Sequence, residues 1–441
     1  MSVPTTRRNF LTRSTAAATG ALMVHRGSPV RGGNSANDKI QLGLIGCGGM
    51  MRGHVKRLAK HTDKAVVTHL CDPDPGQSDT VMQSLGPVAA SVKVPQTLDY
   101  QNVLDDKRVD AMIIATPHHW HVPIGLPALA AGKDVYLEKP ASHVFHEGRL
   151  LIDAVKKYDR VFQHGTQMRS SPVTQQARKV IDSGILGEIK ITKAWNVQNR
   201  GYAQPVPNSQ VPSGVDYDRW LGPAPSQPFN QNRFHRTWRL FRDYGNGDFG
   251  DDGAHDLDMA VFGLGVDSLP VRITAHGSNI QQPGYREFPD NMNVSFQYAD
   301  QRVLIYEDRL FTSYGMHGYD SGNAFYGTEG FMIFTRRGTF RTYLGRQREP
   351  GPTFGKAGRV SAPLLDHTGN FLECIASRKQ PRANEQVAHH SCGLIHLGEI
   401  AYRTRTVLEF DPDAEQITNS ASANAMLTKQ YRTPYGLPKQ A

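Results

Sequence analysis

Lys39-Ile-Gln-Leu-Gly-Leu-Ile-Gly-Cys-Gly-Gly-Met-Met-Arg-Gly-His-Val-Lys-Arg-Leu58 is the stretch that decides the fold. The apolar residues 40–45 predict a strand, the glycines after them a tight turn, and the residues from about Met50 a helix. Unpaired N–H groups and the positive end of the dipole at a helix start can bind a pyrophosphate. Gly46 allows the turn, and Gly48 lets the backbone approach the phosphate because it has no Cβ. Four residues are therefore predicted to bind a dinucleotide: Gly46, Gly48, Gly49 and Met50.

The third small position of this GxGxxG motif is occupied by Met51, which we expect to shift the helix or to hold it further from the strand. The residues 65–71 predict a second strand, and Asp72 ends it, 24 residues after Gly48. A carboxylate there accepts hydrogen bonds from ribose hydroxyls and repels a 2′-phosphate, so the pattern favours NAD over NADP. The alternative is a glycine-rich turn without a ligand.

The first 37 residues differ in composition from the rest. A paired arginine, Arg7-Arg8, precedes the apolar pair Phe10-Leu11, and residues 14–24 form an alanine-rich run too short to span a bilayer. This segment resembles a twin-arginine export signal and predicts contact with that export machinery and a periplasmic or membrane-anchored location. A disordered basic tail is the alternative. The segment has five arginines and no acid, so it leaves +4 of the formal +9 charge on the remainder, which gives no reason to expect nucleic acid.

A length of 441 residues predicts more than one domain. The four cysteines show no CxxC spacing, so we interpret them as small buried hydrophobic residues and expect no disulfide framework and no metal site.

Residues 97–165 continue the alternation of strands and helices. Strands are predicted at 110–115, 134–137 and 160–164, and helices at 100–104, 122–131 and 150–158. This pattern predicts a doubly wound parallel sheet spanning residues 38–165. Ligands bind beyond the carboxyl ends of such strands. Two peptides are placed there, Thr116-Pro-His-His-Trp-His121 and Glu138-Lys139-Pro140.

Lys139 follows a strand end and can hold a substrate hydroxyl oxygen, stabilising the alkoxide that develops as hydride leaves the carbon. A cis peptide at Pro140 would direct Lys139 inward. By itself a Glu-Lys-Pro tripeptide is also a common loop sequence.

Asp251 and His255 lie four residues apart after a glycine-rich entry, so a helix would place them on one face. An imidazole beside a carboxylate is a suitable general base for a sugar hydroxyl, with the carboxylate orienting the ring and supporting its charged form. A metal site that also uses Asp258 lacks a clear fourth ligand, and helix capping by Asp251 or Asp252 is the structural alternative.

The chain resembles the Gfo/Idh/MocA family of NAD(P)-dependent oxidoreductases, because the glycine turn, the Thr116–His121 loop, Glu138-Lys139-Pro140 and Asp251-x-x-x-His255 occur in that family's order. Flanking stretches at 218–225, 238–250, 371–378 and 431–434 resemble its exported bacterial branch. The resemblance implies an α/β Rossmann domain followed by an α+β domain, residues 166–441, whose open, mostly antiparallel sheet supplies a substrate wall and an oligomer interface. Six stretches agree with such a sheet by their β-branched and aromatic content: 189–196, 271–276, 293–298, 302–306, 331–335 and 339–344. Residues 367–377 and 388–404 are predicted to be closing helices.

The resemblance also implies roles for residues. Lys139 and His255 would be the catalytic pair, with Asp251 as third member. Glu138 would contact the cofactor's ribose, and the nicotinamide side would be lined by Thr116, Pro117 and His121. Gln167 and Arg169 follow the last Rossmann strand and would face the nicotinamide as well. Further predicted polyol contacts are His235, Trp238, Arg239 and Asp252, for which packing or salt bridges are the alternative.

The leading functional hypothesis is hydride transfer between NAD and a hydroxyl-bearing carbon of a sugar or cyclitol. An exported enzyme meets no nicotinamide pool, so the alternative is a redox-neutral glycosidase that oxidises, eliminates and re-reduces with tightly held NAD. A non-catalytic sugar-binding protein is disfavoured because Lys139, Asp251 and His255 are all present.

Overall fold

The computed structural model describes residues 39–91, 93–201, 204–281, 286–355 and 366–437. The predicted signal segment, residues 1–37, lies outside the described residues. None of the helices formed by the described residues is both long and apolar enough to cross a membrane.

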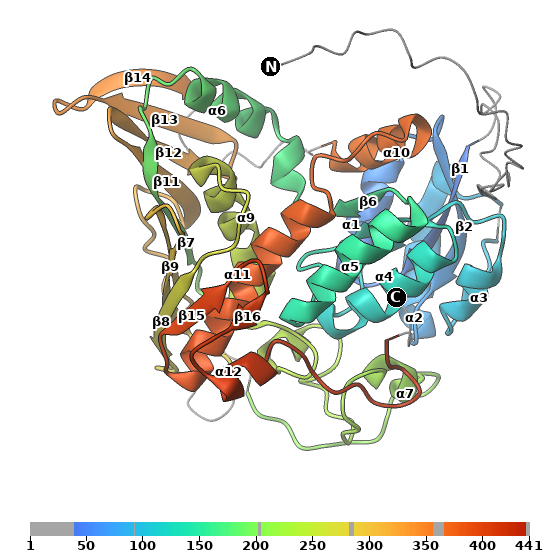
Figure 1. The fold of residues 1–441 in the computed structure, drawn as a ribbon. Helices are drawn as coiled ribbons and strands as arrows, with labels where there is room; N and C mark the ends of the chain where they lie inside the picture. The colour runs from blue at the N-terminus through green and yellow to red at the C-terminus, as the bar shows by residue number, and fades with distance from the viewer. Residues whose placement is uncertain (1–38, 92, 202–203, 282–285, 356–365, 438–441) are drawn as a thin grey trace, which may run out of the picture. The chain divides into compact units, whose positions relative to one another are not determined.

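The first sheet is parallel and six-stranded among the described residues, with the order β3-β2-β1-β4-β5-β6 (Figure 1). Its strands are β1 (Ile40–Ile45), β2 (Ala65–Cys71), β3 (Gln96–Thr97), β4 (Ala111–Ile114), β5 (Asp134–Leu137) and β6 (Phe162–His164). The intervening helices are α1 (Gly49–Leu58), α2 (Pro75–Leu85), α3 (Gln101–Asp105), α4 (His121–Ala130) and α5 (Phe145–Tyr158). The predicted doubly wound sheet is confirmed.

Two helices of the first domain differ from the prediction, and each has an N-terminal capping interaction that the prediction did not take into account. Helix α2 was not predicted, although the Asp74 side chain accepts a hydrogen bond from Gly76 N and Pro75 occupies the first turn. Helix α5 begins at Phe145, five residues before the predicted start, because the Glu147 carboxylate accepts hydrogen bonds from the backbone N–H groups of His143 and Val144.

The second sheet is ten-stranded in the described part of the chain, with the order β14-β13-β12-β11-β7-β10-β9-β8-β15-β16. Its strands are β7 (Ile189–Val197), β8 (Arg272–Ser278), β9 (Asn291–Gln297), β10 (Val303–Arg309), β11 (Ser321–Gly327), β12 (Gly330–Thr335), β13 (Thr339–Leu344), β14 (Glu349–Phe354), β15 (Leu408–Asp411) and β16 (Gln416–Ile417). Only the pair β7–β10 is parallel among them, so the predicted open, mostly antiparallel sheet is confirmed. The prediction lacked strands β11, β14, β15 and β16. Strand β11 was missed because its first residues, Ser-Gly-Asn, include two of low strand propensity.

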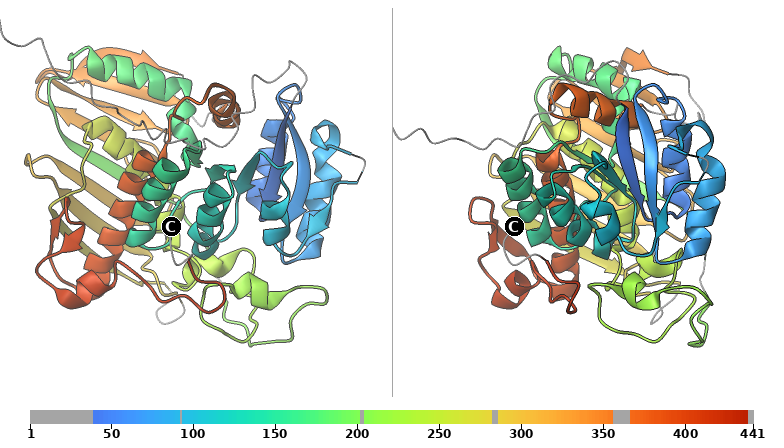
Figure 2. Two further views of the ribbon diagram at one scale, coloured as in Figure 1. Left: turned by 45° about the vertical axis from the view of Figure 1, so that its right-hand side comes forward. Right: turned by 90° about the vertical axis from the view of Figure 1, so that its right-hand side faces the viewer.

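Helices α9 (Gly253–Leu264) and α11 (Glu385–Thr404) pack against this second sheet, and α11 also contacts α5 of the first domain (Figure 2). Helix α10 (His367–Ser377) contacts α1. The C-terminal third of the chain thus returns to the dinucleotide-type domain. Shorter helices are α6 (Pro172–Asp182), α7 (Tyr217–Leu221), α8 (Gly247–Asp251) and α12 (Ala421–Ala425), and one-turn 3-10 helices include η3 (Gln167–Ser170) and η4 (Thr237–Leu240).

Candidate active site

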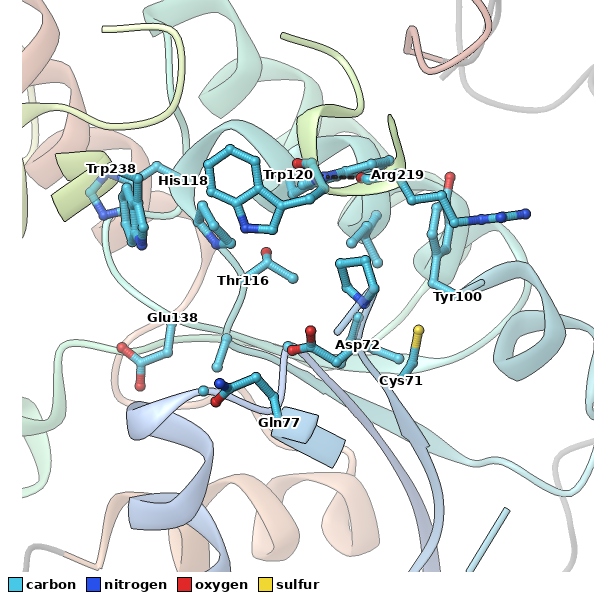
Figure 3. Close-up of a pocket in the computed structure, with 18 of the residues that line it drawn as sticks. Cys71, Asp72, Gln77, Tyr100, Thr116, His118, Trp120, Glu138, Arg219 and Trp238 are labelled. Atoms are coloured by element: carbon cyan, nitrogen blue, oxygen red, sulfur yellow. Dashed lines mark hydrogen bonds between the residues drawn. The ribbon is translucent and has the colours of Figure 1, made fainter. Parts of the chain in front are cut away.

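A cavity of about 1000 Å³ opens at the carboxyl ends of β1, β2, β4 and β5. Residues of the first domain form one wall, and residues of the 216–251 segment and of the C-terminal tail form the other. Figure 3 shows Trp238 and Trp120 on one side of the cavity and Glu138 and Asp72 on the opposite side. This is the position that the parallel-sheet rule predicts for a ligand.

The glycine turn forms an open cradle at the cavity floor. Gly46 has φ +80°, and a Cβ there would lie 2.8 Å from the Ala115 carbonyl group, so no other residue fits. A Cβ on Gly48 would meet no atom within 4 Å. Gly46, Gly48, Gly49 and Met50 all line the cavity, whereas Met51 is fully buried in the core beneath α1. The unusual methionine therefore fills the core and leaves the cradle free.

Two polar groups fit the ribose and nicotinamide parts of a dinucleotide. Asp72 lies on the cavity wall, and its carboxylate accepts hydrogen bonds from the N–H groups of Cys47 (2.7 Å) and Asp74 (2.9 Å). Burial raises the pKa of Asp72 to about 7, against the lowering effect of these hydrogen bonds. Thr116 Oγ1, also on the wall, is buried without a hydrogen-bond partner among the described residues. Such an unpaired group fits a polar ligand, so the residues present suit NAD.

Lys139 and Asp251 meet across the cavity wall. The Lys139–Pro140 peptide is cis, as predicted. Lys139 Nζ lies 2.5 Å from Asp251 Oδ1 and donates a second hydrogen bond to the Asp251 carbonyl oxygen at 2.9 Å. Arg239 Nε lies 2.7 Å from the other carboxylate oxygen of Asp251. Burial alone would raise the pKa of Asp251, but the charges of Lys139 and Arg239 outweigh it and hold the pKa below its usual value.

His255 is placed differently from the expectation. The helical structure is interrupted at Asp252: α8 ends at Asp251 and α9 begins at Gly253. Asp251 and His255 therefore do not share one regular helix. Both carboxylate oxygens of Asp251 face cations, and among the described residues no hydrogen bond joins Asp251 to His255. The prediction that Asp251 orients His255 is therefore corrected.

The imidazole of His255 is buried, and its Nδ1 has no partner among the described residues. Burial, followed by the charges of Lys139 and Arg336, lowers the pKa of His255 to about 3, so the ring is neutral at neutral pH. His255 is not among the described residues that line the cavity.

Glu138 lines the cavity, and its Oε1 lies 2.9 Å from Nε2 of His54, a buried residue of α1. Burial would raise the pKa of Glu138, but the His54 contact, helped by Lys139, lowers it to about 2. His54 was not predicted as a site residue, although it lies within the same motif as the glycines.

Two histidines of the Thr116–His121 loop depart from the prediction: His121 does not line the cavity, and His118, which was not predicted, does. His121 Nδ1 lies 2.7 Å from the Pro140 carbonyl oxygen and Nε2 lies 3.0 Å from that of Thr116, so His121 joins two loops and is absent from the described cavity wall. The predicted nicotinamide-side position is held by Thr116, Pro117 and the unpredicted His118, which all line the cavity. His118 packs edge-on against Trp238, with ring centroids 4.7 Å apart.

The remaining predicted cofactor and substrate residues divide into two groups. Trp238, Arg239 and His235 line the cavity, but His235 pairs with Asp74 beside the ribose-type carboxylate (2.7 Å). The others are not among the described wall residues: Gln167 begins η3, Arg169 forms a bidentate ion pair with Asp258, and Asp252 pairs with Arg200 and Arg336. The salt-bridge alternative thus describes the position of Asp252, and Arg169 forms an ion pair with Asp258 instead of lining the cavity.

No group of three or more histidine, cysteine, aspartate or glutamate side chains suited to a metal ion occurs among the described residues.

Comparison with known families gives two matches that cover most of the chain. Residues 40–166 match the oxidoreductase family with an NAD-binding Rossmann fold. Residues 170–314 and 359–437 match the C-terminal α/β domain of the same kind of oxidoreductase.

Curated relatives include several inositol dehydrogenases. The scyllo-inositol 2-dehydrogenase (NAD(+)) of Bacillus subtilis is 24% identical over 348 residues, which cover 78% of this chain and 88% of the relative. The inositol 2-dehydrogenase/D-chiro-inositol 3-dehydrogenase of Lactiplantibacillus plantarum is 28% identical over 191 residues, which cover 41% of this chain and 52% of the relative. The chain thus spans only about half the length of the Lactiplantibacillus plantarum enzyme and of other curated relatives that it matches.

Solved structures share the fold. A levoglucosan dehydrogenase in complex with NADH and levoglucosan has a TM-score of 0.65 at 20% identity and covers 84% of this chain and 99% of its own. An aldose-aldose oxidoreductase from Caulobacter crescentus in complex with glycerol has a TM-score of 0.64 at 19% identity and covers 85% of this chain and 100% of its own.

Proposed function

We propose that this chain, which belongs to the Gfo/Idh/MocA oxidoreductase family with its NAD-binding Rossmann domain, is a dehydrogenase that transfers hydride between NAD and a hydroxyl-bearing carbon of a sugar, sugar derivative or cyclitol. The observation that carries the proposal is the Lys139–Asp251 ion pair on the wall of a dinucleotide-sized cavity. The names of the relatives, inositol and levoglucosan dehydrogenases, support the substrate class.

Lys139 suits the charge that develops on the substrate oxygen. Two of the three N–H groups of its ammonium face Asp251, which leaves one for a substrate hydroxyl or carbonyl oxygen. Asp251 holds the ammonium in place and is itself held by Arg239. A fixed cation at the oxygen stabilises an alkoxide more than a neutral alcohol, which is the condition for catalysis.

His255 does not share this role, because its ring is not among the described residues that line the cavity. Burial and the Lys139 charge both disfavour the imidazolium, so the ring stays neutral. We therefore assign charge stabilisation and proton transfer to Lys139: its neutral amine accepts the hydroxyl proton in oxidation, and its ammonium returns that proton in reduction.

We also propose that the protein is exported by the twin-arginine route and belongs to the exported branch of the family. The support is the Arg7-Arg8 pair followed by Phe10-Leu11 and an alanine-rich run. A fusion of residues 1–37 to a reporter should be exported, and the Arg7→Lys, Arg8→Lys double variant should not be.

Assembly and domain boundaries remain predictions. A homo-oligomer formed through the second sheet is supported by a row of stacked aromatic rings, Tyr326, Phe331 and Tyr343. Light scattering on the purified protein tests the assembly. The boundary between residues 165 and 166 can be tested by limited proteolysis.

The test of the proposed activity is reduction of NAD by a panel of inositols, anhydrosugars and aldoses. NADH formation by the wild type, lost in Lys139→Ala, is the expected result. Cleavage of a glycoside without net NADH formation would establish the redox-neutral glycosidase in its place.

A further inference from the structure

The end of the cavity beyond Asp72 has the character of a slot for an aromatic base. Its walls on the first domain are the apolar side chains of Leu98, Tyr100, Ile124 and Pro127. In a Rossmann domain the residue at the end of the second strand marks the adenosine ribose. The slot next to Asp72 therefore suits the adenine ring.

The opposite wall of this slot comes from distant parts of the chain. Three segments form it: residues 216–221, 235–236 and 432–436. We name these residues the adenosine clasp. The clasp residues that line the cavity are Arg219, Trp220, His235, Arg236, Pro434, Tyr435 and Gly436. None of the predicted cofactor-binding residues belongs to it.

Three contacts join the clasp to the rim of the first domain on both sides of the slot. His235 Nε2 lies 2.7 Å from Asp74, and the Asp216 N–H donates to the Pro73 carbonyl oxygen at 2.9 Å. Both acceptors follow Asp72 directly in the sequence. On the other side, Arg219 lies 2.9 Å from Asp99, which follows β3.

The C-terminal tail completes the clasp from outside. Arg432 Nε donates to the Gly222 carbonyl oxygen (2.8 Å), and the Tyr435 hydroxyl donates to Asp218 (2.7 Å). The Tyr435 ring packs edge-on against Trp120, with ring centroids 5.6 Å apart. Figures 1 and 2 show this tail running from α12 past α7.

The inner end of the tail is anchored in the first domain. The Tyr431 hydroxyl donates to the buried carboxylate of Glu147 (2.7 Å), and Lys429 Nζ lies 3.2 Å from the same carboxylate. The tail is therefore fixed at both ends of the stretch that covers the slot.

From this arrangement we propose that the adenosine clasp encloses the adenosine half of the dinucleotide, so that NAD is a resident group that leaves only when the clasp contacts break. The inference rests on the proposed function, because it requires that the cavity binds NAD. It goes beyond that function by assigning Arg219 and Tyr435 to cofactor retention. Opening the slot requires at least the Arg219–Asp99 ion pair and the packing of Tyr435 against Trp120 to separate, which slows dissociation.

The test measures the rate at which bound NADH leaves the full-length protein. Protein loaded with NADH is mixed with excess NAD, and the loss of NADH fluorescence is followed. The variants are Arg219→Met and Tyr435→Ala, each with a matched control that removes a similar group far from the cavity, Arg108→Met (an exposed ion pair with Asp106) and Tyr314→Ala (85% exposed). Thermal melting checks that each variant folds.

We expect each clasp variant to release NADH about tenfold or more faster than the wild type, since loss of a close charge or hydrogen-bond pair acts mainly on dissociation. The controls should stay within about twofold of the wild type. Folded clasp variants with wild-type release rates would overturn the clasp while leaving the proposed function intact. A wild-type protein that binds neither NAD nor NADH would overturn both. If Tyr435→Ala does not fold, Tyr435→Leu, which removes the aromatic ring that packs against Trp120, takes its place.

Discussion

Lys139 Nζ lies 2.5 Å from Asp251 Oδ1, an ion pair that joins a strand end of the parallel sheet to helix α8 of the second domain. The pair connects the part of the cavity that suits a dinucleotide to the part built by the substrate domain. Because the carboxylate also binds Arg239, the ammonium is held in a defined position. We infer that this position is where hydride transfer takes place.

Removing either partner of this pair should reduce turnover more than cofactor binding. We expect Lys139→Ala to lower kcat by about 10²-fold or more, since charge and proton handling at the reacting oxygen is worth that much. Asp251→Asn should lower kcat less, because the lysine remains but is held less firmly. The measurement is kcat together with the NADH dissociation constant, and a Lys139→Ala variant with kcat within twofold of wild type would refute the assigned role.

Cofactor affinity should depend on pH through Asp72. Its pKa is raised to about 7 in the free protein, and the ionised form is the one that accepts hydrogen bonds from two ribose hydroxyls. Binding of NAD therefore favours the deprotonated state, so affinity should rise as pH increases to about 7 and then level off. Titration calorimetry from pH 5.5 to 8.5 measures the profile. Asp72→Asn should bind more weakly with a flat profile, whereas a flat wild-type profile would contradict the assignment.

His255 should stay neutral across the working range. Its pKa of about 3 means that protonation occurs only in strong acid, so kcat at saturating NAD should show no inflection near pH 6.5 from this residue. Arg336→Met removes a charge that lowers this pKa and should shift it upward. The ring resonances of His255, assigned by comparison with His255→Gln, report the shift, and an unchanged or lower pKa in Arg336→Met would contradict this account.

Two glycines of the cradle should respond differently to alanine. Gly46→Ala forces a Cβ against the Ala115 carbonyl at a positive φ, so we expect a destabilisation of about 1–3 kcal/mol together with loss of NAD binding. A Cβ on Gly48 meets no protein atom within 4 Å, so Gly48→Ala should keep the wild-type melting temperature but bind NAD at least tenfold more weakly. A Gly48→Ala variant that binds NAD with wild-type affinity would show that the cradle does not hold the phosphates.

The first sheet could be predicted from local pattern, because buried parallel strands are short apolar runs and glycine, aspartate and proline mark their ends. The prediction placed three features where the structure has them: the strand, turn and helix of residues 40–58, and the strand-end residues Asp72 and Lys139. Strand β11 was not, since its stability comes from pairing with β7 and β12 rather than from its own residues.

The site was only partly predictable because its pairings join residues far apart in the sequence. Asp251 was predicted to orient His255 from their spacing, but the break at Asp252 and the cations Lys139 and Arg239 decide where its carboxylate points. His235 was predicted to contact the polyol and instead pairs with Asp74 at the ribose end. Spacing along one element cannot encode such contacts between domains.

The most direct test of the central claim is a single turnover of the NAD-loaded protein with each member of a sugar and cyclitol panel, followed by nicotinamide absorbance. The account predicts that at least one member reduces the cofactor in the wild type, and does so about 10²-fold more slowly in Lys139→Ala. NAD that remains oxidised with every member of the panel, or a Lys139→Ala variant that reacts at the wild-type rate, would contradict it.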